Sequence, residues 1–303
     1  MSADLLQSAR AALQARNEPL RSDVTGAYTE AWAKLDIGSH YNSFPDTISS
    51  AWPALSTAGE QEFARIHAKI MVAAIDRFEE RAIGQHYPAS VRENFRLSYT
   101  RILSAIAARD IGPYGKPSDL LWKEMALATQ RLMPGGARVL EPRAFLPRSI
   151  LFRGGPLQTG RAARLLIRSG TGPYLTMHVH DPEIEKFSEQ GWYDLMLLIA
   201  DVLALRPDLK GVFGGGWLYD PQLPTVSPRL AYHRTLTIPN GAMTFFYAKD
   251  GENSYAFSKS ATRRRLHSEG QYDPELHMWV WERTPLIEWA QKQAGGVGRT
   301  NFI

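Results

Sequence analysis

The sequence predicts an α/β (or α+β) fold, with a mixed sheet and interleaved helices in the C-terminal half and an all-helical lobe before it. Three observations lead to this class. Apolar residues recur at helical spacing up to about residue 135. Short β-prone runs punctuated by glycines begin at Ala137. Strand and helix patterns then alternate along the chain, as layered sheet-and-helix proteins require.

These patterns divide the chain into three parts. We expect a helical N-terminal lobe over residues 1–136, an α/β domain over residues 137–294, and a flexible glycine-rich tail over residues 295–303. In the lobe, the spacing predicts helices over 3–16, 59–84 and 90–110, and a fourth between an N-cap at Ser118 and the break at 134–136. A segment rich in glycine, proline and aromatic residues predicts a loop over 36–53.

The second half predicts seven strands and four helices. The strands cover 138–140, 149–152, 163–168, 174–180, 211–213 with an extension to 218 at most, 243–247 and 277–281. The helices cover 183–205, a segment opened by Ser227 and Pro228, 254–267 and 285–293.

Composition excludes several classes of function. The net charge of +4 is divided evenly, because residues 151–303 carry 17 Lys+Arg against 15 Asp+Glu and residues 1–150 carry 18 against 16. Only one tight basic run is present, so we expect no nucleic-acid partner. The absence of cysteine excludes disulfides, thiolate metal sites and a cysteine nucleophile.

Nothing in the sequence has the pattern of a membrane or export segment. Asp4 and Gln7 stand where a secretory signal needs an apolar core. The longest uninterrupted apolar run, residues 195–200, is far too short to span a bilayer. We therefore expect a soluble, cytoplasmic protein with a small-molecule substrate and no membrane partner.

Reactive side chains concentrate between residues 172 and 220, beginning with His178, His180 and Asp181. In a strand, His178 and His180 would point to the same face and could supply an acid/base pair or chelate a metal. A histidine pair hydrogen-bonded at a buried strand end is the alternative. The spacing of Gly172, His178, His180 and Glu185 resembles the first motif of cupins, which implies a divalent metal on the two histidines and Glu185. Cupins continue in short strands, whereas residues 183–205 have a helical pattern.

The segment after the 211–218 strand combines three glycines, 214–216, with Trp217, Tyr219 and Asp220. Glycines there permit close backbone approach or a bulge. The dinucleotide and P-loop motifs are absent. Asp220 could orient a histidine or cap the turn.

Two further clusters could bind an anion. In a helix, Arg229 and His233 would be i,i+4 neighbours, with Tyr232 beside them as a possible proton donor. Arg263, Arg264 and Arg265 could hold a phosphate or carboxylate through bidentate contacts. An exposed, solvated helix face is the alternative for each cluster.

The order of strands and helices in the C-terminal half resembles the acetyltransferases of the GNAT superfamily. The resemblance rests on the strands near 163–168, 174–180, 211–218, 243–247 and 277–281, with helices between them. It implies that acyl-CoA binds at a splayed pair of strands. The superfamily's pyrophosphate loop, Arg/Gln-x-x-Gly-x-Gly/Ala, is absent after each of these strands.

The leading hypothesis is a small-molecule enzyme that transfers an acyl group from acyl-CoA to an amine. His178 or His180 would be the general base, Asp181 or Asp220 would orient it, and Tyr232 would be the acid. The other predicted contacts are Trp217, Tyr219, Arg229 and His233 for the substrate and Arg263, Arg264 and Arg265 for the cofactor. One alternative is a metal-dependent oxygenase or lyase that uses His178, His180 and Glu185. The other is a non-catalytic small-molecule binding protein with a recognition surface of Trp217, Tyr219, Trp279 and Trp281.

Overall fold

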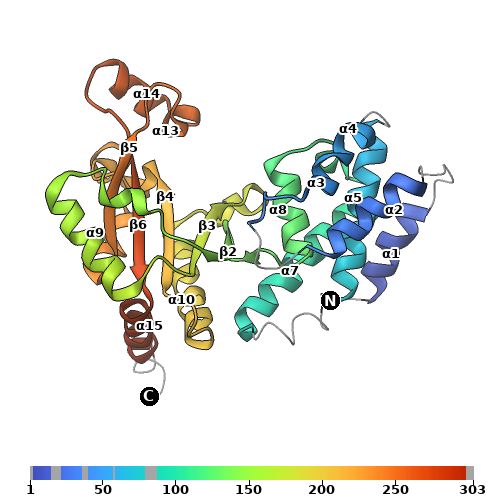
Figure 1. Cartoon of the computed structure of the whole chain (residues 1–303), viewed down its shortest axis with the longest axis horizontal. Coiled ribbons are helices and arrows are strands. Elements are labelled where there is room, and N and C mark those ends of the chain that lie inside the picture. The colour runs from blue at the N-terminus through green and yellow to red at the C-terminus, as the bar shows by residue number, and fades with distance from the viewer. Residues whose placement is uncertain (1–2, 15–21, 36–39, 57–58, 79–86, 298–303) are drawn as a thin grey trace. The chain divides into compact units, whose positions relative to one another are not determined.

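The computed structural model describes residues 3–14, 22–35, 40–56, 59–78 and 87–297, which form two compact units (Figure 1). The helical unit comprises Met1–Pro142 together with Val179–Pro182. The α/β unit comprises Arg143–His178 together with Glu183–Ile303. One short segment of four residues after His178 therefore belongs to the helical unit, although the chain on both sides of it belongs to the α/β unit.

Helices build most of the described part of the helical unit, which is not all-helical as predicted because residues 133–134 and 138–142 are in strands. The helices are α1 (Ala3–Gln14), α2 (Ser22–Ala33), α3 (Asp46–Ser49), α4 (Ala51–Ser56), α5 (Glu60–Asp76), α7 (Ala89–Ala107), the 3-10 turn η1 (Gly112–Tyr114) and α8 (Asp119–Ala128). Ser118 caps α8 as predicted, because its hydroxyl accepts a hydrogen bond from the Leu121 N–H at 3.1 Å. α8 ends well before residue 134, because Gln130 takes a φ of 61° and turns the chain out of the helix.

Aromatic side chains from several of these helices surround a buried histidine. Trp32 of α2 stacks on Trp122 of α8 with ring centroids 6.1 Å apart. His67 of α5 is fully buried beside them, with its Nε2 2.6 Å from the Tyr28 hydroxyl. Its Nδ1 lies 2.8 Å from the carbonyl oxygen of Phe63. Both ring nitrogens are therefore satisfied by a neutral imidazole, whose Nδ1–H donates to Phe63 and whose Nε2 accepts from Tyr28.

The stability of the helical unit is expected to depend on pH through His67. Burial lowers the pKa of His67 from 6.5 to about 4, and the hydrogen bond to Phe63 opposes this only in part. The unfolded chain therefore takes up a proton at this residue before the folded chain does. The resulting stability is fully present above pH 6.5 and is lost as the pH falls toward 4, by about 3 kcal/mol in total. Chemical unfolding between pH 4 and 7 measures the loss. His67→Gln should flatten this part of the profile, and an unchanged slope in that variant would contradict the assignment.

The strands form one mixed sheet in the order β1-β2-β3-β4-β6-β5. They are β1 (Met133–Pro134), β2 (Arg138–Ala144), β3 (Tyr174–Val179), β4 (Gly211–Gly216), β5 (Met243–Lys249) and β6 (Glu275–Glu282). β3 and β4 are parallel, whereas the pairs β1–β2, β4–β6 and β5–β6 are antiparallel. The mixed sheet with interleaved helices confirms the predicted α/β class.

The part of the sheet that belongs to the α/β unit, from β3 to β5 in the strand order, is covered on both faces, as Figure 1 shows. The covering helices are α9 (Gly155–Ser169), α10 (Glu189–Leu205) and α15 (Arg283–Val297). Because strand side chains alternate, β6 contributes to both faces. Met278 and Val280 pack in the core that includes Leu165 of α9. On the opposite face, Trp279 contacts Trp192 of α10 at 5.7 Å and Trp281 contacts Trp289 of α15 at 5.3 Å.

Short helical turns make up most of the remaining connections. They are η2 (Arg148–Leu151), η3 (Asp181–Lys186), η4 (Trp217–Tyr219), α11 (Leu223–Val226), η5 (Pro228–Leu230), α12 (Tyr232–Thr235), η6 (Ile238–Asn240), α13 (Tyr255–Ser258) and α14 (Ala261–Ser268). α15 continues through Val297, and the remainder of the expected tail, 298–303, lies outside the described residues, as does the predicted helix stop at Gly84.

Two predicted strands are wrong. Residues 163–168 lie inside α9, where Pro156 occupies the first turn and only Ala162 and Leu165 are buried. Ile167, which gives this run its strand-like pattern, is 87% exposed. Residues 149–152 fall mainly within η2. The predicted loop over 36–53 contains α3 and the start of α4.

Three predicted helices are divided by internal caps. The predicted 183–205 helix starts only at Glu189, where the Ser188 hydroxyl accepts from the Gly191 N–H. Ser254 and Ser260 cap α13 and α14 separately, which divides the predicted 254–267 helix. The segment opened by Ser227 and Pro228 is likewise divided, into η5 and α12.

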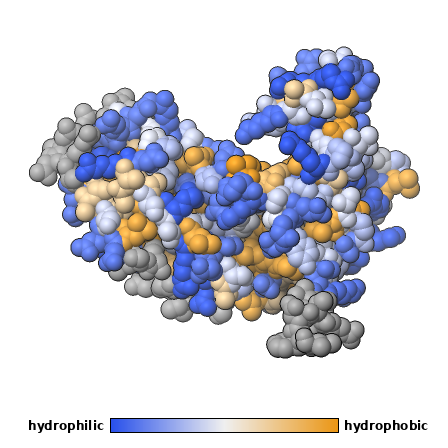
Figure 2. Space-filling model, turned by 180° about the vertical axis from the view of Figure 1, so that it is seen from behind, coloured by the Kyte–Doolittle hydropathy of each residue, from blue (hydrophilic) through white to orange (hydrophobic). Residues whose placement is uncertain are grey.

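No helix within the described ranges is long and apolar enough to cross a membrane. Hydrophilic side chains are spread over the face of the chain visible in Figure 2.

Candidate active site

The parallel strands β3 and β4 pair only at their N-terminal ends. In the described chain their ladder has two residue pairs, Leu175 with Val212 and Thr176 with Phe213. β3 continues to Val179 and β4 to Gly216 without extending that ladder. β4 stays fully paired with β6 on its other side, from Gly211 to Gly216. The two parallel strands therefore diverge at their carboxyl ends, which is where ligands bind in open α/β sheets.

The glycines of β4 allow side chains to approach its backbone closely at this divergence. A Cβ on Gly214 would lie 2.7 Å from the Tyr219 hydroxyl and 3.1 Å from Cε of Met177. Tyr219 from η4 and Met177 from β3 therefore occupy the space beside Gly214. By contrast, a Cβ on Gly215 would meet only Cε of Met278, at 3.7 Å, and one on Gly216 would meet nothing within 4 Å.

His178 follows Met177 in the diverging part of β3 and is half-buried. Strand alternation places its side chain on the same face as Tyr174, which packs in the core under α9. It is thus a titratable side chain, partly open to solvent, beside the diverging ends of the two strands.

His180 occupies a different environment. β3 ends at Val179, so the strand alternation expected for His178 and His180 does not extend to His180. Its side chain is 1% exposed, with Nε2 2.8 Å from Oε1 of Glu124. Arg101 donates to both oxygens of the same carboxylate at 2.8 and 3.1 Å. His180 therefore belongs to a buried charged network inside the helical unit.

Asp220 holds two backbone segments rather than a histidine. Its side chain is fully buried and accepts from the Gln222 N–H at 2.8 Å and from the Glu275 N–H at 2.9 Å. Its charge also reaches Tyr272, whose pKa is raised first by burial and then by Asp220. Asp220 thereby fixes the start of β6 next to η4.

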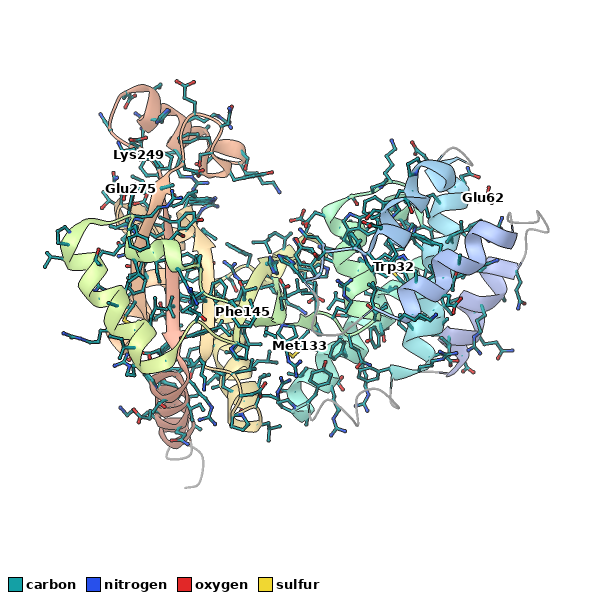
Figure 3. The ribbon with its side chains drawn as sticks, in the orientation of Figure 1. Trp32, Glu62, Met133, Phe145, Lys249 and Glu275 are labelled. Carbon is teal, nitrogen blue, oxygen red and sulfur yellow. The ribbon has the colours of Figure 1, made fainter. Side chains whose placement is uncertain are left out.

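The start of β6 carries a histidine–carboxylate pair that the sequence analysis missed. Glu275 lies beside Lys249 of β5 at this end of the sheet (Figure 3). Oε2 of Glu275 lies 2.9 Å from Nε2 of His277, whose side chain is 8% exposed. The other nitrogen, Nδ1, is buried and has no hydrogen-bond partner among the described residues. The signal was a glutamate two residues before a histidine in a predicted strand, which puts both side chains on one face.

His277 is close to the divergence of β3 and β4 through the β4–β6 pair. It lies directly opposite Gly216 of β4 and Phe246 of β5. Because a carboxylate only accepts hydrogen bonds, Nε2 of His277 carries the proton in the contact with Glu275 and Nδ1 keeps a lone pair. The pair could therefore accept a proton, although its free nitrogen is covered in this structure.

The other predicted substrate contacts mostly lie in the core. Tyr219 stacks on Trp279 at 5.6 Å and is 2% exposed. His233 is 1% exposed, packs on Trp192 at 4.7 Å, and places Nδ1 3.1 Å from the Leu230 carbonyl oxygen. Tyr232, the predicted acid, is also buried and stacks on His233.

These positions also correct two expectations drawn from the sequence. Arg229 is exposed on η5 while His233 is buried on α12, so they do not share one helix face. Trp279 and Trp281 are fully buried, so with Tyr219 they form part of the core and not an exposed recognition surface.

Each of the three consecutive arginines has a partner within the α/β unit, and the partner of Arg265 lies at the end of its own helix. Arg263 is buried, donates to the Ser227 hydroxyl at 2.7 Å and lies over the Trp217 ring at 4.5 Å. Arg264 donates to the Phe257 carbonyl oxygen at 2.5 Å. Arg265 pairs with Glu269 at 2.8 Å in an exposed contact. Arg264 and Arg265 remain exposed on α14, whereas Arg263 and Trp217 hold the α13–α14 segment to η4.

The predicted metal ligands do not come together. Within the described ranges, no group of three or more His, Asp or Glu side chains is placed to hold a metal ion. Glu185 and Asp181 are exposed on η3, and His180 is engaged with Glu124. The metal-dependent alternative therefore has no support from this arrangement.

The chain shares its fold with solved structures of an acyltransferase. No protein-family model matches the sequence, and no curated protein does. Two solved structures of an acyltransferase, one with decanoyl-CoA and teicoplanin and one with CoA and 10C-teicoplanin, each match 92% of this chain and 86% of theirs, at 11% identity and a TM-score of 0.50. A third, with decanoyl-CoA, matches with the same coverage at 12% identity and a TM-score of 0.46. At this identity the likeness shows a shared fold.

Proposed function

We propose that this protein transfers an acyl group from acyl-CoA to an amine, with a GNAT-like α/β domain over residues 137–294. The observation that carries the proposal is the divergence of β3 and β4 after two residue pairs. The GNAT resemblance implies an acyl-CoA site at a splayed strand pair of this kind. The solved acyltransferases of the same fold were crystallised with CoA or decanoyl-CoA, which supports this choice of cofactor.

The facing edges of the diverging strands would hold the acyl-pantetheine portion. Beyond Thr176 and Phe213 the strands do not pair with each other, so their backbone groups can bond to a ligand's amides. Gly215 and Gly216 leave room there. The exposed guanidinium groups of Arg264 and Arg265 are the proposed contacts for the cofactor's phosphates, in the absence of the usual pyrophosphate loop.

The proposed chemistry needs one base and one proton donor. The amine nitrogen attacks the thioester carbonyl carbon, the C–N bond forms, and the C–S bond breaks to release the CoA thiolate. His178 takes the proton from the attacking nitrogen, because among the histidines near the divergence its side chain is the one partly open to solvent. Solvent is the proposed proton donor to the thiolate, because the Tyr219 hydroxyl lies on the opposite face of the sheet, where its ring is buried and stacks on Trp279.

Acyl-CoA should raise the melting temperature of the full chain. A ligand at a hundred times its Kd adds about 2.7 kcal/mol of stability, which is a shift of several degrees. Acetyl-CoA and decanoyl-CoA at millimolar concentration are the probes, with thermal unfolding as the measurement. The absence of a shift with both would contradict the proposal.

A matched pair of glycine variants tests the location. Gly215→Val adds a side chain in the proposed site, where a Cβ makes only ordinary contact. It should remove the acyl-CoA shift and leave the ligand-free melting temperature nearly unchanged. Gly160→Val makes the same change on the exposed part of α9, where a Cβ meets nothing within 4 Å, and should retain the shift. A full shift in Gly215→Val would place the cofactor elsewhere.

A further inference from the structure

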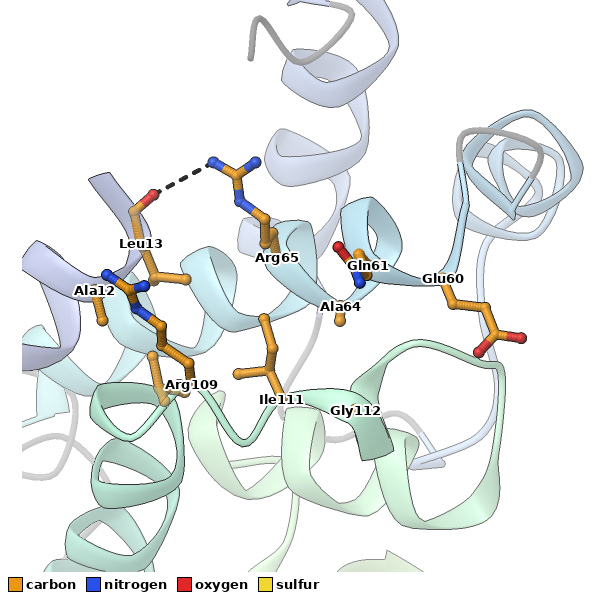
Figure 4. A pocket seen from close by; sticks show the side chains of 10 residues that line it. Ala12, Leu13, Glu60, Gln61, Ala64, Arg65, Arg109, Ile111 and Gly112 are labelled. Atoms are coloured by element: carbon orange, nitrogen blue, oxygen red, sulfur yellow. Dashed lines mark hydrogen bonds between the residues drawn. The ribbon is translucent and has the colours of Figure 1, made fainter. Parts of the chain in front are cut away.

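The helical unit contains a cavity that the proposed acyl transfer does not use. It has a volume of about 360 Å³ and lies between α1, α5, the end of α7 and η1 (Figure 4). This volume is in the range of small-molecule sites and corresponds to on the order of a dozen water molecules. The cavity is therefore large enough for a ligand of roughly ten non-hydrogen atoms.

One side of the cavity is apolar. Leu13 of α1, Ala64 of α5 and Ile106 of α7 are buried in its wall, and Ile111 is half-buried beside them. These side chains come from three helices and the turn after α7. They offer an apolar surface to a ligand without a hydrogen-bond requirement.

Two arginines line the same cavity. Arg65 of α5 is 8% exposed, and its Nη2 lies 3.5 Å from the carbonyl oxygen of Leu13, the contact drawn in Figure 4. Arg109 follows α7, and in the described chain its side chain forms no hydrogen bond or ion pair. The guanidinium groups of both arginines lie near Leu13 in Figure 4.

The backbone of Arg109 is in a conformation that favours glycine. Its φ is 61°, and the chain turns out of α7 through bonds from Arg109 N–H to Ile106 and from Asp110 N–H to Ala105. Glycine is the usual residue in this C-terminal helix turn, and a residue with a Cβ costs on the order of 1 kcal/mol there. The helix turn alone thus gives no reason for an arginine. Arg109 is an exposed residue whose side chain borders the cavity.

The carboxylate near the cavity is already paired. Glu60 lines the cavity too, but its Oε1 lies 2.8 Å from Nζ of Lys116, and both side chains are largely exposed. The pKa of Lys69 is lowered mainly by burial and further by the positive charge of Arg65. Positive charge therefore predominates at this cavity.

We propose that this cavity is a second ligand site, which binds an organic carboxylate with a short apolar body. The carboxylate would lie between Arg65 and Arg109, where planar guanidinium groups can bond it in a bidentate way. The apolar body would contact Leu13, Ala64, Ile106 and Ile111. The site lies within the helical unit and does not depend on the acyl-CoA site proposed above.

Octanoate is the probe, titrated calorimetrically into the full chain. We expect saturable binding by the wild-type protein and at least tenfold weaker binding by Arg109→Gly. Since glycine suits a φ of 61°, this variant should melt at the same temperature as the wild type or higher, so weaker binding cannot come from misfolding. Arg143→Gly is the matched control, because Arg143 is exposed, has a φ of 63° and does not line the cavity. It should bind octanoate as the wild type does.

Further binding measurements distinguish the explanations for octanoate binding. Octanol binding as tightly as octanoate would overturn the role of the two arginines. Equal octanoate affinity in wild type and Arg109→Gly would overturn the site, and so would loss of binding in Gly215→Val, which alters the proposed acyl-CoA site alone. Retention of octanoate binding in Gly215→Val would support the site even if acyl-CoA fails to bind.

Discussion

Replacing Glu124 with alanine is expected to lower the free energy of unfolding by about 3–5 kcal/mol, because it removes the carboxylate that bonds the buried His180 and the partly buried Arg101. Glu124 is 1% exposed and accepts hydrogen bonds from Arg101 and from His180. The guanidinium group of Arg101 is partly buried, so water replaces the lost carboxylate only in part. Denaturant unfolding of the full chain, followed by the circular-dichroism signal of its helices, measures the change in the free energy of unfolding.

Two variants serve as controls for this effect. Glu93→Ala removes an exposed glutamate that lies 3.6 Å from Arg96, and should change stability by less than about 1 kcal/mol. The double variant Glu124→Ala/His180→Ala should lose less than the sum of its single variants, because they remove the same interaction. If Glu124→Ala were no more destabilising than Glu93→Ala, the network would have no stabilising role.

The sequence predicted those parts of the fold that local patterns determine. Ser118 was recognised as a cap because its hydroxyl bonds within its own helix turn, to Leu121. The strands that became β4, β5 and β6 were recognised from short apolar runs bounded by turn residues. The run at 163–168 was ambiguous, because only its tertiary neighbours decide that Leu165 is buried while Ile167 is exposed.

Less of the candidate site could be predicted, because its arrangement depends on contacts between residues that are far apart in the sequence. The sequence located His178 and the three glycines of β4, but it could not show that the β3–β4 ladder stops after two pairs, because register is a property of both strands. The partner of His180 is Glu124, 56 residues earlier in the chain, so the local His-x-His pattern suggested a shared role that the structure does not support. The pair of Glu275 and His277 could have been found by strand alternation only with the predicted 277–281 strand extended back to Glu275, where β6 begins.

Loss of the proposed general base should give the largest effect on activity. His178→Ala is expected to reduce kcat for acyl transfer by about 10²–10⁴-fold, the usual contribution of a positioned base. The KM for acyl-CoA should change little, because the proposed cofactor contacts come from the strand backbones and from Arg264 and Arg265. The measurement is release of the CoA thiol from acetyl-CoA or decanoyl-CoA with a primary amine present, after subtraction of the rate without amine.

Chemical rescue distinguishes a base from a side chain that only supports the fold. Imidazole added to the buffer should restore part of the activity of His178→Ala, because a small base can enter the space that the side chain leaves, whereas a folding defect would not respond. His277→Gln is the informative comparison, since its ring bonds Glu275 and its free nitrogen is covered. It should retain most of the activity if Glu275 and His277 only brace the start of β6. A large loss in His277→Gln that imidazole rescues, together with near-normal activity in His178→Ala, would transfer the role of base to the pair on β6.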